Sequence, residues 1–224
     1  MEVNYKKLYE LQDQVLNLVS SLENDFYLTG GTALHRFYFG ARHSDDLDFF
    51  VTNGTNFNED VNEIIEELVE KGYSVAEDVK SRDFYRVTLN DTLQLDFVND
   101  RVYRYKKSIL KDGIKIDNKT NILTNKVNTI INRDEEKDVF DLFCLAYNEE
   151  FNWKDILEIT NKKAVLEKDI LAYRLKSFPL EWLKRIKTLK NIIINKEQIE
   201  ILCNDMLNDL DNSLYKNRNE KIEK

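Results

Sequence analysis

The sequence predicts an α+β fold, in which a small mixed sheet flanked by helices precedes a C-terminal helical bundle. Up to about residue 98, short apolar runs of strand length alternate with segments of helical periodicity. From about residue 121 onward only helical periods recur. We therefore expect two domains, a sheet domain over residues 1–115 and a helical bundle over residues 116–224.

The composition is that of a globular protein. Of the 224 residues, 42% are hydrophobic and 33% are charged, with one Pro and six Gly. Such a chain is not disordered, collagen-like or a turn-rich all-β protein. It is long enough to bury a core, as one large domain or as two small ones.

The first half begins with an amphipathic helix of about 20 residues. Its apolar residues recur at helical spacing: Leu8, Leu11, Val15, Leu18 and Leu22. A short strand at 26–29 follows, and Gly30-Gly31 turns the chain into a helix that ends at about Phe39, with Gly40 as its C-terminal cap.

Further strands complete the expected sheet. A strand at 46–52 precedes a helix from about residue 61 to residue 72. Three more strands are expected, at 73–79, 84–89 and 93–98. Asn90-Asp91 suits the tight turn of a hairpin between the last two.

The second half predicts helices at 121–133, 135–148, 153–162, 165–176, 179–192 and 196–217. Pro179 fits a first helical position, where its missing N–H costs nothing. Trp182, Ile186 and Leu189 would then form one apolar stripe.

Two carboxylates lie at the start of the strand at 46–52. Successive side chains on a strand alternate faces, so Asp46 and Asp48 point the same way, about 6.6 Å apart along the chain. Leu47 faces the opposite side, toward packing. Oxygen ligands of this kind suit Mg²⁺ or Mn²⁺. The alternative is a strand end whose acids are merely solvated.

A glycine turn precedes these acids. Gly30 and Gly31 allow unusual backbone angles and close approach of a ligand, and the helix start offers N–H groups to an anion. The Thr32 hydroxyl could donate to a phosphate oxygen. The alternative is a plain strand-to-helix turn with Thr32 as the N-cap.

A third carboxylate, Asp96, interrupts the apolar strand at 93–98. If this strand neighbours the strand at 46–52, three carboxylates converge. Such a cluster can hold two metal ions about 3.5–4 Å apart, around an in-line displacement.

These residues carry a family resemblance. Gly30-Gly31-Thr32, followed by Arg42, Ser44 and Asp46-Leu47-Asp48, resembles the first motif of the AbiEii/AbiGii-type toxin nucleotidyltransferases, within the polymerase-β-like superfamily. Lys126 with Arg133 resembles the lysine-containing helix of that family. Lys137-Asp138 with Asp141 resembles its charged-Asp-x-x-Asp helix start. The resemblance covers roughly residues 25 to 147.

The resemblance implies a metal-dependent transferase that moves a nucleoside monophosphate from an NTP to an acceptor and releases pyrophosphate. In relatives this is the toxin of a toxin–antitoxin or phage-defence pair, and some act on tRNA 3′ ends. RNA is the acceptor that we expect here, and a cognate antitoxin is an expected partner. A small-molecule acceptor, a protein acceptor and a non-catalytic nucleotide-binding protein on this fold remain alternatives.

The resemblance also implies residue roles. Asp46, Asp48 and Asp96 would bind Mg²⁺ or Mn²⁺, with Asp96 also helping to deprotonate the acceptor hydroxyl. Binding of the NTP would fall to the following residues: Gly30, Gly31, Thr32, Arg42, Ser44, Lys126 and Arg133. Lys126 would neutralise triphosphate charge.

Asp138 is a further catalytic candidate. An acid near a helix start also interacts favourably with the helix dipole, so a structural role for Asp138 and Asp141 stays open. Lys126 and Arg133 are seven residues apart, on one helix face, so both could contact one anion.

Charge is distributed unevenly along the chain. Residues 101–133 hold nine Lys or Arg against two Asp, or +7, so the remainder of this −8 protein carries −15. A basic middle in an acidic protein suggests a polyanion site or an ordinary solvated face. Within it, Tyr103 and Tyr105 alternate with basic residues, a pattern that suits single-stranded RNA but also an exposed basic strand.

The remaining signals concern the compartment. Cys144 and Cys203 are expected to be free thiols of a reducing compartment. No stretch approaches the roughly 20 apolar residues of a membrane helix, and the N-terminal segment lacks the apolar core of a signal peptide. We therefore expect a cytoplasmic protein without a membrane partner.

Overall fold

The computed structural model describes residues 3–216 and has the expected mixed α+β architecture. The chain forms two compact units. The first contains the chain up to Tyr38, His43–Val102 and Lys106–Asn118, and the second contains Phe39–Arg42, Tyr103–Tyr105 and the chain from Lys119 onward. Two short segments of the first half thus belong to the second unit. The predicted contiguous domains over 1–115 and 116–224 stay a prediction.

The first unit is built on a seven-stranded sheet. Its strands are β1 (Tyr27–Thr29), β2 (Leu47–Thr52), β3 (Val75–Lys80), β4 (Phe84–Leu89), β5 (Leu93–Asp100), β6 (Ile109–Lys111) and β7 (Ile114–Ile116). They lie in the order β3-β4-β5-β2-β1-β7-β6. The β2–β5 and β1–β7 pairs are parallel and the other neighbours are antiparallel, so the sheet is mixed.

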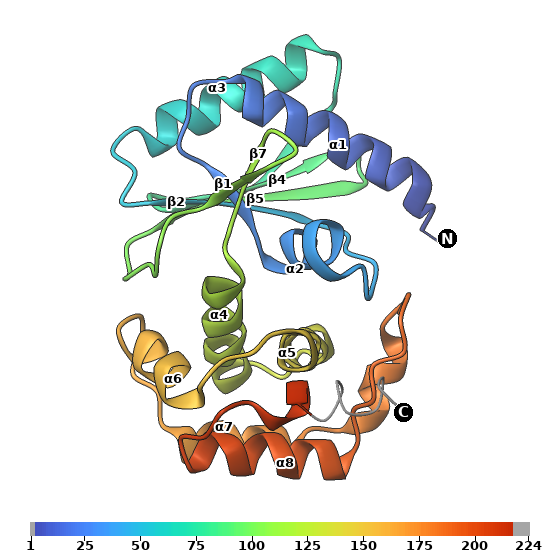
Figure 1. Ribbon diagram of the computed structural model, residues 1–224. Coiled ribbons are helices and arrows are strands. Elements are labelled where there is room, and N and C mark those ends of the chain that lie inside the picture. The colour runs from blue at the N-terminus through green and yellow to red at the C-terminus, as the bar shows by residue number, and fades with distance from the viewer. Residues whose placement is uncertain (1–2, 217–224) are drawn as a thin grey trace. The chain divides into compact units, whose positions relative to one another are not determined.

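Helices cover both faces of this sheet. The helices α1 (Tyr5–Ser21) and α3 (Phe57–Glu70) lie on one face, and α2 (Gly30–Leu34) lies on the other (Figure 1). The chain continues from α2 into a π-helix, η1 (His35–Phe39), and Gly40 follows with a φ of 57°. The predicted turn from strand into helix, with Gly40 beyond its end, is therefore confirmed.

The core of the first unit lies between the sheet and α1 and α3. Leu47, Phe49 and Val51 of β2 are buried, while the intervening residues are partly exposed. Phe49 stacks on Phe97 of β5, with ring centroids 5.4 Å apart. The alternation predicted for this strand is present, and it leaves the other face of β2 to the carboxylates.

The β6–β7 hairpin was not predicted. Its turn is Asp112-Gly113, and both residues have positive φ, 50° and 81°. Asp-Gly between two short apolar runs is a strong hairpin signal, but three-residue strands are too short for their alternation to be recognised.

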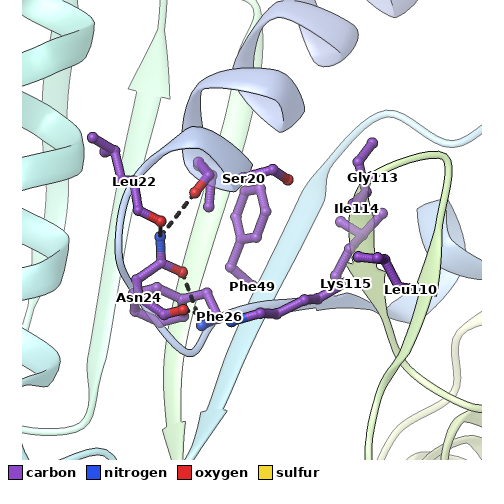
Figure 2. Close-up of a pocket in the computed structure, with 11 residues that line it drawn as sticks. Ser20, Leu22, Asn24, Phe26, Phe49, Leu110, Gly113, Ile114 and Lys115 are labelled. Atoms are coloured by element: carbon purple, nitrogen blue, oxygen red, sulfur yellow. Dashed lines mark hydrogen bonds between the residues drawn. The ribbon is translucent and has the colours of Figure 1, made fainter.

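A cavity of about 150 Å³ lies between α1, β1 and this hairpin. Leu22, Phe26, Phe49 and Ile114 are among its lining residues (Figure 2). Since Phe49 points away from the face that carries Asp48, the cavity does not belong to the acid site.

The second unit consists of α4 (Lys119–Asn132), α5 (Glu136–Asn148), α6 (Trp153–Asn161), α7 (Lys168–Ser177), a 3₁₀-helix η2 (Leu180–Arg185) and α8 (Lys196–Leu207). Trp153, Leu171 and Cys203 are among its fully buried residues, and both cysteines are free thiols. The predicted bundle of helices is confirmed, apart from two elements.

The helix predicted at 179–192 is wrong. Only η2 forms, and residues 186–192 are not helical. The N–H groups of Leu189 and Lys190 donate to the carbonyl oxygen of Ala41, at 2.7 and 3.1 Å. Ile186 packs against a buried cluster that includes Phe140. Backbone hydrogen bonds to another segment thus replace the helical ones that the apolar spacing suggested.

The last predicted helix, 196–217, is too long. The helix α8 ends at Leu207, and Asp209 adopts a positive φ of 56°. The N–H of Leu210 returns to the carbonyl oxygen of Asp205, at 2.8 Å, which closes the helix end. Residue 217, at the end of that prediction, lies outside the described residues.

Candidate active site

Two of the predicted carboxylates are neighbours in the sheet of the first unit. Asp48 of β2 lies opposite Asp96 of β5 in a parallel pair, and opposite Thr29 of β1 in an antiparallel pair. Residues opposite each other place their side chains on the same face. Asp46 directly precedes β2, and both it and Asp48 are partly exposed. The structure therefore brings these acids to one face of the sheet.

Gly30 holds the turn against Asp48. It has a φ of 67°, and a Cβ at this position would lie 2.1 Å from Oδ2 of Asp48. No side chain fits in that space, and most residues avoid this φ. The predicted glycine turn thus faces the carboxylate. Gly31 lies buried inside α2 and does not share the left-handed conformation.

Thr32 and Ser44 hold the loop that carries Asp46. The Thr32 hydroxyl is buried, 2.9 Å from Ser44 Oγ and 2.5 Å from the carbonyl oxygen of Asp46. The Gln12 amide donates to the carbonyl oxygens of Ser44 and Asp45, at 3.1 and 3.2 Å. We expected Thr32 and Ser44 to bind the nucleotide. In this structure both are buried and contact other protein groups, and binding of the nucleotide by them stays a prediction.

Asp96 has an unpredicted partner, Arg86 of β4. Nε of Arg86 donates to Oδ1 of Asp96 at 2.7 Å, and Nη2 donates to Oδ2 at 2.6 Å. Hydrogen bonds and charge from Asp96, followed by the charges of Asp46 and Asp48, raise the pKa of Arg86 despite the opposing effect of burial. The guanidinium is therefore a permanent cation beside the acids.

Arg42 lies in the second unit and is buried. Its Nε and Nη2 donate to the two carboxylate oxygens of Asp141, at 2.7 and 2.8 Å. We expected Arg42 to bind the NTP. It is buried and its guanidinium is held by Asp141, and binding of the NTP by Arg42 stays a prediction.

Lys126 is held by two carboxylates of α5. Its Nζ lies 2.7 Å from Asp138 Oδ1 and 2.7 Å from Asp141 Oδ2. Burial alone would lower the pKa of Lys126, but the charges of Asp141 and Asp138 outweigh it and raise the pKa. The ammonium group is therefore charged and fixed in place.

Asp138 joins Lys126 to Arg133. Nε of Arg133 donates to Oδ2 of Asp138 at 2.7 Å, and more than half of the Arg133 side chain is exposed. Burial would raise the pKa of Asp138, but Lys126 and Arg133 outweigh it and lower the pKa. Lys126 and Arg133 thus share one protein carboxylate, that of Asp138, and their contact with a nucleotide stays a prediction.

The sequence matches a known protein family over most of its length. A family described as "Nucleotidyl transferase AbiEii toxin, Type IV TA system" matches residues 15–213. The chain belongs to this family. An uncharacterized protein from Aquifex aeolicus (strain VF5) is 31% identical to this AbiEii family member over 171 residues, which cover 70% of this chain and 76% of that protein.

Solved structures share the fold of this family member. A putative nucleotidyltransferase from Helicobacter pylori matches 99% of each chain with a TM-score of 0.60 and 19% identity. JHP933 from Helicobacter pylori matches 100% of this chain and 97% of its own, with a TM-score of 0.56 and 20% identity. At these identities the likeness shows the nucleotidyltransferase fold alone.

The AbiEii family implies a divalent metal, and the acids present fit one. Mg²⁺ is usually bound through one or two protein carboxylates together with substrate phosphates. Asp46 and Asp48 supply two partly exposed carboxylates. Across residues 3–216, no group of three His, Cys, Asp or Glu side chains is arranged to hold a metal ion. The donors thus suit a metal that shares its coordination with a nucleotide.

Sequence reasoning missed Arg86 in this family member, although a signal was present. Phe84, Arg86 and Thr88 alternate with the buried residues of β4, so Arg86 is a cation on the polar face of a strand. The hairpin turn at Asn90-Asp91 has positive φ at both residues and places Arg86 opposite Asp96. Counting back from that turn would have found the pair.

In the described part of the chain, no helix has the length and apolar character needed to cross a membrane.

Proposed function

We propose that this protein transfers a nucleoside monophosphate from an NTP to an acceptor, and that Asp46 and Asp48 hold the required Mg²⁺ or Mn²⁺. The observation that carries the proposal is the packing of Gly30 against Asp48, 2.1 Å from Oδ2 to the position of a Cβ. Two neighbouring carboxylates can bind a metal ion that also binds a triphosphate, and here one of them is held against a glycine turn. Family membership supports the same reaction.

Each side chain of the proposed site has a role that follows from its charge and position. Asp46 and Asp48 bind the cation, which when present neutralises phosphate charge and supports departure of pyrophosphate. Gly30 leaves room for the Asp48 carboxylate beside the turn that is proposed to hold the phosphates. Lys126 and Arg133 are proposed to supply positive charge for the triphosphate, with Lys126 acting as a point charge.

Asp138 has a supporting part in this proposal. It carries hydrogen bonds from both cations, at 2.7 Å each. Its carboxylate therefore orients Lys126 and Arg133, the two groups that are proposed to contact the phosphates. Asp138 thus has a proposed positioning role in addition to its proposed catalytic role.

RNA, such as tRNA, is the proposed acceptor. Tyr103 is 40% exposed, and Nζ of Lys162 lies 5.2 Å from the centroid of its ring. Asn121 clamps the backbone of Tyr105, accepting from its N–H at 3.0 Å and donating to its carbonyl oxygen at 2.8 Å. An exposed aromatic ring with a cation on a fixed segment supports binding of single-stranded RNA.

The test is incubation of the protein with each labelled NTP, Mg²⁺ and total RNA. Wild-type protein should label RNA, and Asp48→Asn should abolish labelling. Asp78→Asn is the matched control, because Asp78 is an exposed acid of the same sheet, on edge strand β3. Absence of labelling by the wild type on RNA, aminoglycosides and protein alike would contradict the proposal.

The same assay separates the acceptors. Label in the small-molecule or protein fraction, and none in RNA, would retain the transferase and replace its acceptor. The toxin role further predicts growth arrest on expression, relieved by co-expression of a cognate antitoxin and absent for Asp48→Asn.

A further inference from the structure

A single row of side chains crosses the sheet of the first unit on the face that carries the acids. Arg86 lies opposite Asp96, Asp96 opposite Asp48, and Asp48 opposite Thr29. Neighbouring strands are about 4.8 Å apart, and opposite residues share a face. Arg86 is therefore the terminal cation of a row whose middle holds two carboxylates.

The Arg86–Asp96 pair has the geometry of a strong contact. Both carboxylate oxygens of Asp96 accept from the guanidinium, at 2.7 and 2.6 Å. The Asp96 side chain is 10% exposed and that of Arg86 is 36% exposed. A bidentate fork of this kind fixes orientation as well as charge, and a carboxylate with little solvent contact gives up such a partner only at a cost.

This pair changes what the acid site can bind. The fork of Arg86 takes one lone pair on each oxygen of Asp96, which leaves that carboxylate fewer lone pairs and less uncompensated charge to direct at a metal ion. The permanent positive charge of Arg86 also opposes a second cation in the same row. Asp46 and Asp48 reach solvent. Over the described residues, no cluster of three suitable side chains surrounds a metal position.

We propose that Arg86 is a fixed counter-cation of the acid site, which holds Asp96 out of metal coordination so that Asp46 and Asp48 bind a single divalent cation. Asp96 is then a positioning residue that orients Arg86, in place of the third ligand and base expected from the sequence. The inference rests on the proposed function for the assignment of a metal to Asp46 and Asp48.

The test measures metal binding by the full chain without nucleotide. Free Mn²⁺ is followed by electron paramagnetic resonance, and the water molecules bound to Tb³⁺ are counted from luminescence lifetimes in H₂O and D₂O. Wild-type protein should bind one Mn²⁺. Arg86→Lys keeps the charge but loses the fork. It should release Asp96 to the metal, and because one more charged ligand then joins the site, Mn²⁺ should bind roughly tenfold more tightly and Tb³⁺ should lose about one water ligand relative to the wild type.

Two further variants show whether the changes in Mn²⁺ affinity and Tb³⁺ hydration arise from Asp96. Adding Asp96→Asn to Arg86→Lys should remove the gain, because the new ligand is gone. Arg101→Met is the matched control: Arg101 donates through Nε and Nη2 to Asp83, at 2.8 and 2.6 Å, in a pair that excludes all three acids. It should leave Mn²⁺ affinity and Tb³⁺ hydration unchanged.

Several outcomes overturn the proposal. Two Mn²⁺ per wild-type chain would do so. Unchanged affinity and hydration in Arg86→Lys, with Asp96→Asn weakening Mn²⁺ binding as severely as Asp48→Asn, would show Asp96 to be a ligand. In both cases the wild type still binds metal, so the proposed function stands. Absence of Mn²⁺ and Tb³⁺ binding to the wild type would instead remove the metal site of the proposed function and this inference with it.

Discussion

Arg42 and Asp141 lie 99 residues apart in the sequence and form a buried bidentate ion pair, with Nε–Oδ1 and Nη2–Oδ2 distances of 2.7 and 2.8 Å. Both residues are among those that carry the sequence resemblance to the family. The Ala41 carbonyl, one residue earlier, accepts from the N–H groups of Leu189 and Lys190. The segment Phe39–Arg42 is thereby fixed in the second unit, although its sequence neighbours belong to the first.

Loss of the Arg42 side chain should therefore destabilise the protein severely. Arg42 is 2% exposed and Asp141 is 0% exposed, so Arg42→Met removes both hydrogen bonds of the fork and leaves the buried carboxylate with Lys126 as its remaining cation. We expect a loss of about 3–5 kcal/mol in the free energy of unfolding, measured by chemical denaturation. Lys176→Met is the control, because Lys176 and Glu200 form an exposed pair that should contribute less than about 1 kcal/mol. Equal losses in both variants would refute the burial argument.

A methyl group at Gly30 should disable the acid site. Gly30→Ala places a Cβ 2.1 Å from Oδ2 of Asp48 and forces a strained φ, so Asp48 must move. We expect nucleotidyl transfer to fall at least about 100-fold, as follows a displacement of about 1 Å at a reacting group. Gly72→Ala is the control, since Gly72 has a φ of 87° but no atom within 4 Å of its Cβ position. It should lose stability of roughly 1 kcal/mol, because an L-residue is strained at positive φ, and should retain activity.

The ion pairs of Asp138 should make stability depend on acid pH. Its pKa is lowered in the folded protein below the ordinary value of 3.8, chiefly by Lys126 and Arg133 against the effect of burial. The contribution of Asp138 is therefore present above the ordinary value and is lost as the pH falls through the lowered one. Asp138→Asn should be less stable than wild type at neutral pH, and the difference should shrink below about pH 4.

Val139→Ala provides the comparison for that pH series. Val139 is a buried apolar neighbour of Asp138, so its truncation should cost about the same free energy of unfolding at every pH, because no charge is involved. Urea denaturation from neutral to acid pH measures both variants. A difference between wild type and Asp138→Asn that does not vary with pH would contradict the assignment.

Contact with RNA should depend on Tyr103. Replacement by Ala removes a stacking surface worth about 1–3 kcal/mol per base, so affinity for single-stranded RNA should fall roughly 5- to 100-fold. Lys162→Ala should lower the dependence of affinity on salt by about one counterion. Tyr173→Ala is the control, because Tyr173 is 70% exposed on α7. Equal effects of the two tyrosine substitutions in filter binding would refute the assignment.

Elements with a clear period were predictable, and those held by distant partners were not. The alternation of β2 has a local cause and forms as expected, and the helix predicted at 135–148 forms as α5. Residues 186–192 show the limit of such patterns. Ile186 and Leu189 have helical spacing, yet hydrogen bonds to Ala41 hold the chain in another conformation.

The candidate site divides in the same way. The residue types and spacing of Gly30, Asp46 and Asp48 indicated an acid site beside a glycine turn, because strand alternation and glycine stereochemistry act over a few residues. Which cation meets which carboxylate depends on strand register and helix packing, which join residues far apart in the chain. Only the tertiary structure therefore decided that Arg86 holds Asp96 and that Arg42 is buried on Asp141.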